Sequence, residues 1–313
     1  MPNTTAHRTT RSKPGMVSRR IAPLAPLAIS LLTQATLPTP SGTDTAQVCG
    51  DEIPTYLECH NQYPTGCSKA AKYDGYLNYL KNLLVLPTKA PERFLTATKD
   101  FDTLEQGLPH DLTRTNHKDL EDKLGKLGDG HVTGVIGYLY YAKKGGIESS
   151  NCGLNDLADI DYHIGIGFDP ELAAQLRSGQ KLTPDQRRQQ KTVMDQTSIV
   201  VEMTPHWRAN FRSGWSLDAL APAVGHKVRV VGQLLVDNEH YDPKDDCGFQ
   251  NAQTSCWRLS IWELHPVTDF QVCNSDDCTE TSHDWIDLEN FGPGAAAPTA
   301  PAAAPANQPR SEP

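Results

Sequence analysis

The sequence lacks several motifs that would point directly to an enzyme class. No G-x-G-x-x-G or Walker-type loop follows a predicted strand, so nothing supports nucleotide-cofactor chemistry. No G-x-S-x-G elbow is present, and no two cysteines form a C-x-x-C pair. The chain is also short of positive charge, with a formal net charge of -9 at pH 7. Broad affinity for nucleic acid or anionic membranes is therefore not expected, because such binding needs a positive surface.

A long uninterrupted apolar run, as a membrane span requires, is missing as well. The N-terminus instead carries a basic leader followed by IAPLAPLAISLLTQATL, in which Pro23 and Pro26 interrupt the apolar residues. This pattern is typical of a secretory signal peptide, predicted over residues 1–35, and residues 36–48 are predicted to be a flexible spacer. We expect a secreted or periplasmic protein that has no membrane span once the signal is removed.

The eight cysteines agree with export, because an even number of cysteines in an exported chain indicates disulfides. Proximity in the sequence predicts the bonds Cys247–Cys256 and Cys273–Cys278. The four other cysteines, Cys152 among them, are left to staple the N-terminal segment. With every cysteine paired, thiol catalysis is not expected.

Hydrophobic periodicity divides the remaining chain into a helical and a strand-rich part. Residues 49–128 are predicted to be mostly helical, with helices within 69–84 and 116–128. From residue 129 the period changes to two and predicts strands at 131–142, 161–168, 197–205, 226–240 and 258–272. A charged insertion at 169–196 is predicted to hold two helices that start near Asp169 and Thr183, and 216–225 a short helix. The Ala/Pro-rich tail, 281–313, is predicted to be disordered.

Three strands, a helix and two further strands predict an OB-like five-stranded β-barrel over 129–280, preceded by a small helical segment. The fold class is α+β, and another small closed or half-open barrel is the alternative. The runs GGIESSNCG, DYHIGIG, VVEMTPHWR, VRVVGQLLVDNEH and SIWELHPVTDFQVC resemble a set of exported bacterial proteins with an OB-like barrel. The resemblance covers roughly residues 130–273. It implies the fold and export, and it implies no particular activity.

Alternation in the second, third and fifth strands predicts a polar cluster, because each strand has one apolar face and one that carries acids or histidines. If these strands are neighbours in the barrel, His163, Glu202 and His265 converge on an outer patch. They would then be ligands of one divalent transition metal, zinc or manganese, with Glu263 or Asp161 as a general base or an outer partner. Two interpretations stay open beside this one. The residues would form a solvated polar face, or they would be buried, hydrogen-bonded groups beneath the charged insertion.

Two loops add further candidates. The stretch TPHWRANFRSGW is basic and aromatic, and Trp207, Arg208, Arg212 and Trp215 are predicted to contact a ligand by stacking and charge. Packing of the tryptophans against the barrel end is the alternative. Residues 237–246 are rich in acids but lack EF-hand spacing, which favours a solvated turn over a calcium site.

Two functions are compatible with these features. The first is an exported OB-like binding module for a small or oligomeric ligand. The alternative is a metal-dependent hydrolase, nuclease-like by fold analogy alone. The hydrolase requires His163, Glu202 and His265 to lie within a few ångströms around an open coordination position. The binding module requires an accessible groove or aromatic platform.

Overall fold

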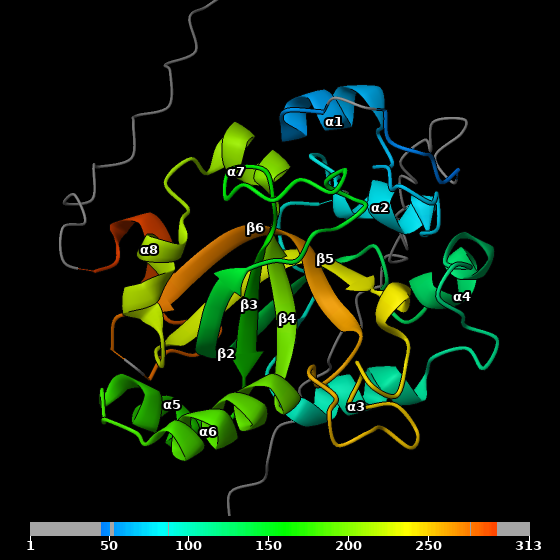
Figure 1. The fold of residues 1–313 in the computed structure, drawn as a ribbon. Helices are drawn as coiled ribbons and strands as arrows, with labels where there is room; N and C mark the ends of the chain where they lie inside the picture. Colours follow the sequence, from blue (N-terminus) through cyan, green and yellow to red (C-terminus); the bar gives the residue numbers. More distant parts are fainter. Residues whose placement is uncertain (1–44, 51–52, 87, 276, 293–313) are drawn as a thin grey trace, which may run out of the picture. The chain divides into compact units, whose positions relative to one another are not determined.

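The computed structural model describes residues 45–50, 53–86, 88–275 and 277–292 (Figure 1). The predicted signal peptide, most of the predicted spacer and the end of the predicted tail lie outside these residues. The described chain combines helices and strands, which confirms the predicted α+β class. Among the described residues, no helix is both long enough and apolar enough to cross a membrane.

The strands form a single sheet in which five of them pair in a ring. They are β1 (Phe94–Leu95), β2 (Val132–Lys144), β3 (Tyr162–Gly167), β4 (Ser198–Met203), β5 (Lys227–Val236), β6 (Trp262–Cys273) and β7 (Trp285–Asp287). The order is β1-β2-β3-β4-β6-β5, and β5 also pairs with β2, which closes the ring. The β4–β6 pairing is parallel, whereas the other ring pairings are antiparallel. The five strands predicted from the period of two are the five strands of this ring.

Short helices precede the ring, as the sequence predicts. They are α1 (Tyr56–Gln62), α2 (Gly75–Lys81), α3 (Thr98–Gln106), the 3-10 turn η1 (Lys118–Leu120) and α4 (Glu121–Gly125). Helix α2 begins where the Asp74 carboxylate accepts a hydrogen bond from the backbone N–H of Leu77. Tyr76, Leu77 and Leu80 then pack against Leu235 of β5, so α2 lies on the outer side of the ring.

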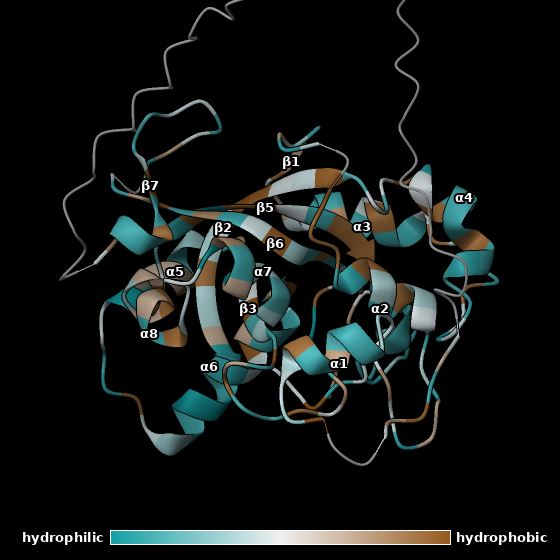
Figure 2. Ribbon diagram, turned by 90° about the horizontal axis from the view of Figure 1, so that it is seen from above, coloured by the Kyte–Doolittle hydropathy of each residue, from teal (hydrophilic) through white to brown (hydrophobic). Residues whose placement is uncertain are grey.

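The later helices are α5 (Pro170–Arg177), α6 (Pro184–Gln196), α7 (Pro205–Phe211) and α8 (Leu217–Leu220). Asp169 and Thr183 cap α5 and α6, the starts that the sequence predicts. Figure 1 shows these two helices at the opposite end of the strands from α1, α2 and α7. Helix α6 is largely polar and mostly exposed, which is its teal colour in Figure 2.

Helix α7 occupies the basic, aromatic stretch, which the sequence predicts to be a loop. The Thr204 hydroxyl accepts a hydrogen bond from the backbone N–H of Trp207, and Pro205 stands at the first helical position. Proline has its φ already set for a helix and loses no hydrogen bond there, so this local sequence starts a helix.

The core lies inside the ring, on the apolar faces of the strands. Ile164 of β3, Val201 of β4 and Leu264 of β6 are fully buried in one cluster, as their alternation predicts. Gly165 lies beneath the Tyr141 ring, where a Cβ atom would come within 2.3 Å of a ring carbon. A side chain at this position would therefore displace the tyrosine from β3.

All eight cysteines are paired. The predicted bonds Cys247–Cys256 and Cys273–Cys278 are confirmed. Cys49–Cys67 closes the start of the N-terminal segment. Cys59–Cys152 joins α1 to the loop between β2 and β3, so this loop is fixed to the N-terminal segment.

Secondary structure continues beyond residue 281, where the disordered tail is predicted to begin. Strand β7 pairs with β6, and the turn η4 (Leu288–Asn290) follows it. Trp285 is buried against Ile136 and the Cys273–Cys278 pair. The disulfide and the tryptophan therefore hold this segment against the sheet.

Candidate functional site

The structure brings together the polar faces of β3, β4 and β6. His163 lies directly opposite Glu202 in the antiparallel register of β3 and β4, and the parallel pairing of β4 with β6 places Glu202 beside His265. The Nε2 atom of His163 is 3.2 Å from Glu202 Oε1, and the Nδ1 atom of His265 is 3.4 Å from Glu202 Oε2. The predicted convergence of the three strands is therefore confirmed.

The polar faces are not the outer, solvated patch that the sequence predicts. Glu263 is completely buried, and the His265 side chain is 1% exposed. Side chains from α2 and from the loop of residues 145–161 close over the strands. We call the resulting set the buried charge cluster: Lys81, Glu148, Asp161, His163, Glu202, Asp237, Arg258, Glu263 and His265. Glu148, at 21%, is its most exposed side chain.

Two cations that no sequence pattern marks, Arg258 and Lys81, neutralise part of the cluster. The guanidinium of Arg258 donates to Asp237 Oδ2 and to Glu263 Oε2, each at 2.8 Å. The Lys81 ammonium, at the end of α2, lies 3.5 Å from Asp237 and 3.9 Å from Glu263. Burial alone would lower the pKa of Lys81, but attraction to these carboxylates outweighs burial and holds the pKa well above its usual value.

Asp237 belongs to this network and not to a solvated acidic turn or a calcium site. Its Oδ2 atom is 2.6 Å from His240 Nδ1, and the carboxylate is completely buried. Burial would raise the pKa of Asp237, but His240, Lys81 and Arg258 together hold it well below its usual value. The start of the acidic stretch is thus a structural ion pair.

The carboxylates and histidines also form two groups with the donor atoms of a metal site. One is Glu148, His163 and Glu202, and the other is Asp161, Glu202 and His265; within each group the ligand atoms lie within 4.8 Å of one another. The predicted ligand set of His163, Glu202 and His265 is not one of these groups in the described chain. The two histidines contact opposite oxygens of Glu202, and so they are divided between the groups.

Charge repulsion and burial shift the pKa values in both groups. Burial raises the pKa of Asp161 to about 6; His265 opposes this shift, and the nearby Glu148 and Glu202 carboxylates add to it. For His163, burial favours the neutral ring, but attraction to Glu202 and the hydrogen bond to Glu148 hold the pKa well above its usual value. Burial likewise opposes ionisation of Glu202, whereas His163 and His265 lower its pKa. The two histidines therefore hold Glu202 in its ionised form.

The predicted ligand residues of the basic, aromatic stretch are used mainly for packing. Arg208 is buried, stacks on the Tyr162 ring and donates hydrogen bonds to backbone carbonyl oxygens before β3 and at the end of β4. Trp215 is buried in the core, and Arg212 pairs with Asp269 at 3.3 Å. Trp207 is half-buried. These four residues do not form the accessible aromatic platform that the binding hypothesis requires.

A cavity of about 400 Å³ lies beside the same helix, between α1, α7 and the end of α2. It is lined by His60, Pro64, Tyr79, Asn82, Leu83, Leu84, Val85 and His206. The rings of His60 and His206 are 4.3 Å apart between centroids. His206 Nδ1 lies 3.0 Å from the carbonyl oxygen of Asn82, and the buried Nδ1 atom of His60 has no hydrogen-bond partner among the described residues.

Both histidines of this cavity are held in the neutral form. Burial lowers the pKa of His60 to about 4, with a further contribution from His206, and burial also lowers the pKa of His206. In the sequence, His206 stands within the basic, aromatic stretch, and no pattern marks His60. The two lie far apart in the sequence, and no local pattern joins them.

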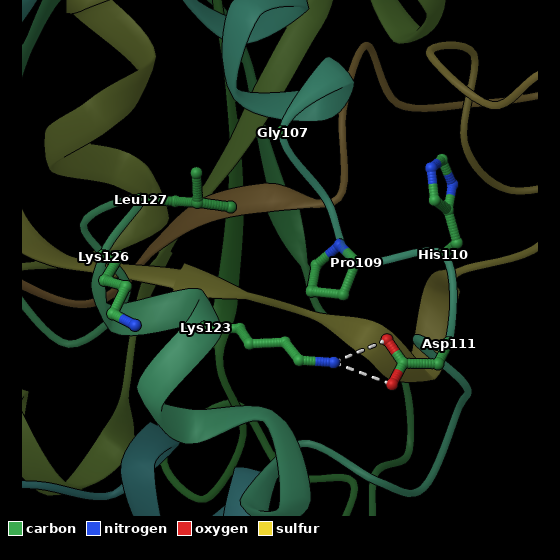
Figure 3. Close-up of a pocket in the computed structure, with 7 residues that line it drawn as sticks. All are labelled: Gly107, Pro109, His110, Asp111, Lys123, Lys126 and Leu127. Atoms are coloured by element: carbon green, nitrogen blue, oxygen red, sulfur yellow. Dashed lines mark hydrogen bonds and ion pairs between the residues drawn. The ribbon is translucent and has the colours of Figure 1, made fainter.

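Figure 3 shows a second cavity, of about 530 Å³, near α3 and α4. Its lining includes Asp111 and Lys123, whose side chains form an ion pair with contacts of 3.1 and 2.8 Å. Both side chains are more than half exposed. Because the two charges already pair with each other and are solvated, this cavity offers a ligand no unpaired charged group of Asp111 or Lys123.

Comparison of the whole chain with protein-family models, with curated proteins and with solved structures finds no match. The buried charge cluster and the cavity of His60 and His206 are therefore the features from which a function can be inferred.

Proposed function

We propose that the chain is an exported binding module with an OB-type barrel, and that it holds a small neutral molecule in the cavity of His60 and His206. The order of three strands, helices and two strands supports the OB-type assignment, as does the closed ring. Four disulfides and the basic, apolar leader support export to the periplasm or beyond, because disulfides persist in oxidising compartments. The resemblance to exported bacterial proteins belongs to the same proposal.

The observation that carries the proposal is a pair of neutral histidines in the wall of an otherwise largely apolar cavity. The Asn82 carbonyl oxygen can only accept a hydrogen bond, so His206 carries its proton on Nδ1 and keeps Nε2 as an acceptor. Leu83, Leu84 and Val85 supply apolar surface. The site therefore suits a ligand with an apolar body and one hydrogen-bond donor.

The size of the cavity favours a small molecule over an oligomer. Its volume of about 400 Å³ falls within the roughly 300–1,000 Å³ of small-ligand sites. The absence of charge on both rings at neutral pH disfavours an ionic ligand, because nothing in the histidine pair would offset its desolvation.

Phenol and toluene test this chemistry as a matched pair, since they have similar shapes and only phenol can donate a hydrogen bond. We expect phenol to cause saturable shifts of the His206 ring nitrogens in ¹⁵N-detected NMR spectra. Toluene should bind more weakly, by roughly 0.5–1.5 kcal/mol, which is the net contribution of one hydrogen bond. Equal binding of the two would contradict the role of the histidine acceptor.

His206→Phe keeps an aromatic ring in the wall and removes the acceptor, so phenol should lose its advantage over toluene. Arg212→Gln, just after α7, is the control, because Arg212 faces Asp269 and does not line the cavity. Loss of phenol binding in Arg212→Gln but not in His206→Phe would instead support the ligand site predicted from the sequence, at Trp207, Arg208, Arg212 and Trp215. Saturable binding of neither probe to the wild type would refute the proposed cavity.

A metal-dependent hydrolase remains the second candidate, because carboxylates and histidines converge at Glu202. The difficulty is access: Glu202 is 2% exposed and His163 9%. A hydrolytic role therefore requires the loop of residues 145–161 to open. Hydrolysis of bis(4-nitrophenyl) phosphate after loading with zinc or manganese, and its loss in His265→Gln, would support this function; no turnover by loaded protein would exclude it for this substrate.

A further inference from the structure

We propose that Asp161, Glu202 and His265 together bind one divalent transition-metal ion beneath the loop of residues 145–161. The inference is independent of the ligand cavity, and it specifies the ligands on which the second candidate function would depend. It replaces His163, the ligand expected from the sequence, with Asp161.

The three residues come from adjacent strands and meet on one face. Asp161 directly precedes β3, Glu202 is in β4 and His265 is in β6, and β4 pairs with both neighbours. One ligand atom from each lies within 4.8 Å of those from the other two. All three residues are at most 2% exposed, so the site is formed inside the protein and not on its surface.

Each of the three residues has one polar atom held by a close polar contact and a second polar atom that makes no hydrogen bond. Asn151 donates to Asp161 Oδ2 at 2.7 Å, His163 Nε2 is 3.2 Å from Glu202 Oε1, and Glu263 Oε1 is 3.1 Å from His265 Nδ1. The remaining atoms, Asp161 Oδ1, Glu202 Oε2 and His265 Nε2, make no hydrogen bond among the described residues. Glu202 Oε2 has only the ion-pair contact of 3.4 Å with His265 Nδ1.

This pattern is unusual for structural polar groups, because buried polar atoms are nearly always bonded. It is the pattern of metal ligands, whose outer atoms are oriented by hydrogen bonds while the other atoms face the ion. Glu263 has the outer role for His265, since a carboxylate at Nδ1 leaves Nε2 bare and raises its basicity. The carboxylate that the sequence suggested as a base is thus a positioning residue.

The charges around the site favour a dication. Lys81 and Arg258 pair with Asp237 and Glu263. Of the three proposed ligands, Glu202 faces His163, whose raised pKa supplies one positive charge, and Asp161 accepts a hydrogen bond from the neutral amide of Asn151. A divalent cation would offset the negative charge that His163 leaves uncompensated on the carboxylates of the two groups.

One imidazole nitrogen and two carboxylate oxygens suit zinc or manganese. Three protein ligands also leave a coordination position open, as catalytic zinc sites do. The loop above the site restricts exchange: Asn151 reaches down to Asp161, and Cys152 is bonded to Cys59 of α1. Gly145 lies so close that a Cβ atom there would be 3.0 Å from the His163 ring. We expect the ion to enter during folding, before this disulfide closes.

The test uses the mature, full-length exported protein, folded oxidatively with either Zn²⁺ or Mn²⁺ and then freed of loosely bound ions. Elemental analysis should find one ion per chain. Asp161→Asn is nearly isosteric and should weaken binding by more than the roughly 10–100-fold that loss of an outer partner costs. Glu148→Gln, in the other carboxylate–histidine group, is the matched control and should retain the ion.

Two measurements keep the test valid if a variant folds poorly. Near-ultraviolet circular dichroism reports whether each variant retains packed aromatic side chains. In the wild type, ¹⁵N NMR of the histidine rings should show the ion on His265 Nε2. Wild-type protein without metal after folding with either ion would overturn the inference. So would loss of the ion in Glu148→Gln with retention in Asp161→Asn, or equal loss in both.

Discussion

Replacing Arg258 by methionine is expected to destabilise the folded chain by about 3–5 kcal/mol, because it leaves buried carboxylates without their closest cation. Arg258 is completely buried, and its guanidinium contacts Asp237 and Glu263 at 2.8 Å each. Methionine is apolar and can follow the aliphatic part of the arginine side chain, so the substitution removes the guanidinium and its charge while keeping part of the packing.

The magnitude follows from two opposing terms. A unit charge pair about 4 Å apart contributes about 4 kcal/mol at an effective dielectric constant of about 20, and Arg258 makes two such pairs. Desolvation of the buried guanidinium costs several kcal/mol and offsets part of this gain. Lys81 still lies 3.5 and 3.9 Å from the same carboxylates after the substitution, which places the expected loss toward the lower end of the range.

Urea denaturation at pH 7 with the disulfides intact measures the loss, since urea does not screen ion pairs as guanidinium salts do. The double variant Arg258→Met/Glu263→Gln should be more stable than the sum of the single variants by more than about 1 kcal/mol, because it no longer buries an unpaired Glu263. A loss below about 1 kcal/mol for Arg258→Met, or strict additivity in the double variant, would refute the reasoning.

Three further predictions concern other buried contacts. Burial opposes protonation of His117, but its contact with Asp129 at 2.9 Å raises the pKa to about 9. The free energy of unfolding should therefore fall as the pH rises from 6.5 to 9.5, because the folded state loses a proton that it binds more tightly than the unfolded state. A fall of the same size in the variant His117→Gln would contradict this. The variant Cys59→Ser/Cys152→Ser should lose roughly 4 kcal/mol, measured by thermal unfolding, and limited proteolysis should cut the loop of residues 145–161; a loop that resists cleavage would show that other contacts hold it. Arg208→Met should cost about 3 kcal/mol, because several carbonyl oxygens lose their donor; a stable variant with reduced phenol binding would instead assign Arg208 to the ligand site.

Features set by neighbouring residues were predictable from the sequence. The period of two located the five ring strands and placed Ile164 and Val201 on the inner face, opposite His163 and Glu202. The caps at Asp169 and Thr183 were predictable for the same reason, because a cap acts within one turn. The pair Thr204–Pro205 is an equally local signal, and reading it would have identified α7.

The burial of the charge cluster was not predictable in this way. Glu263 and His265 have the alternation of a half-solvated strand, and nothing in β6 shows that another segment covers them. The covering residues, Lys81 and Glu148, come from distant parts of the chain and are not marked by any pattern. The ligand groups depend on which oxygen of Glu202 each histidine contacts, which only three-dimensional packing decides.

The position of Lys81 also limits where the chain can be divided. The sequence suggests a boundary near residue 128, between a helical segment and the strands. Yet the ammonium on α2 and the disulfide Cys59–Cys152 both cross that boundary and end at the same face of the ring. A fragment that begins at residue 129 would have to expose the carboxylates that Lys81 now covers, so the smallest part of this protein suitable for expression should begin before Cys59.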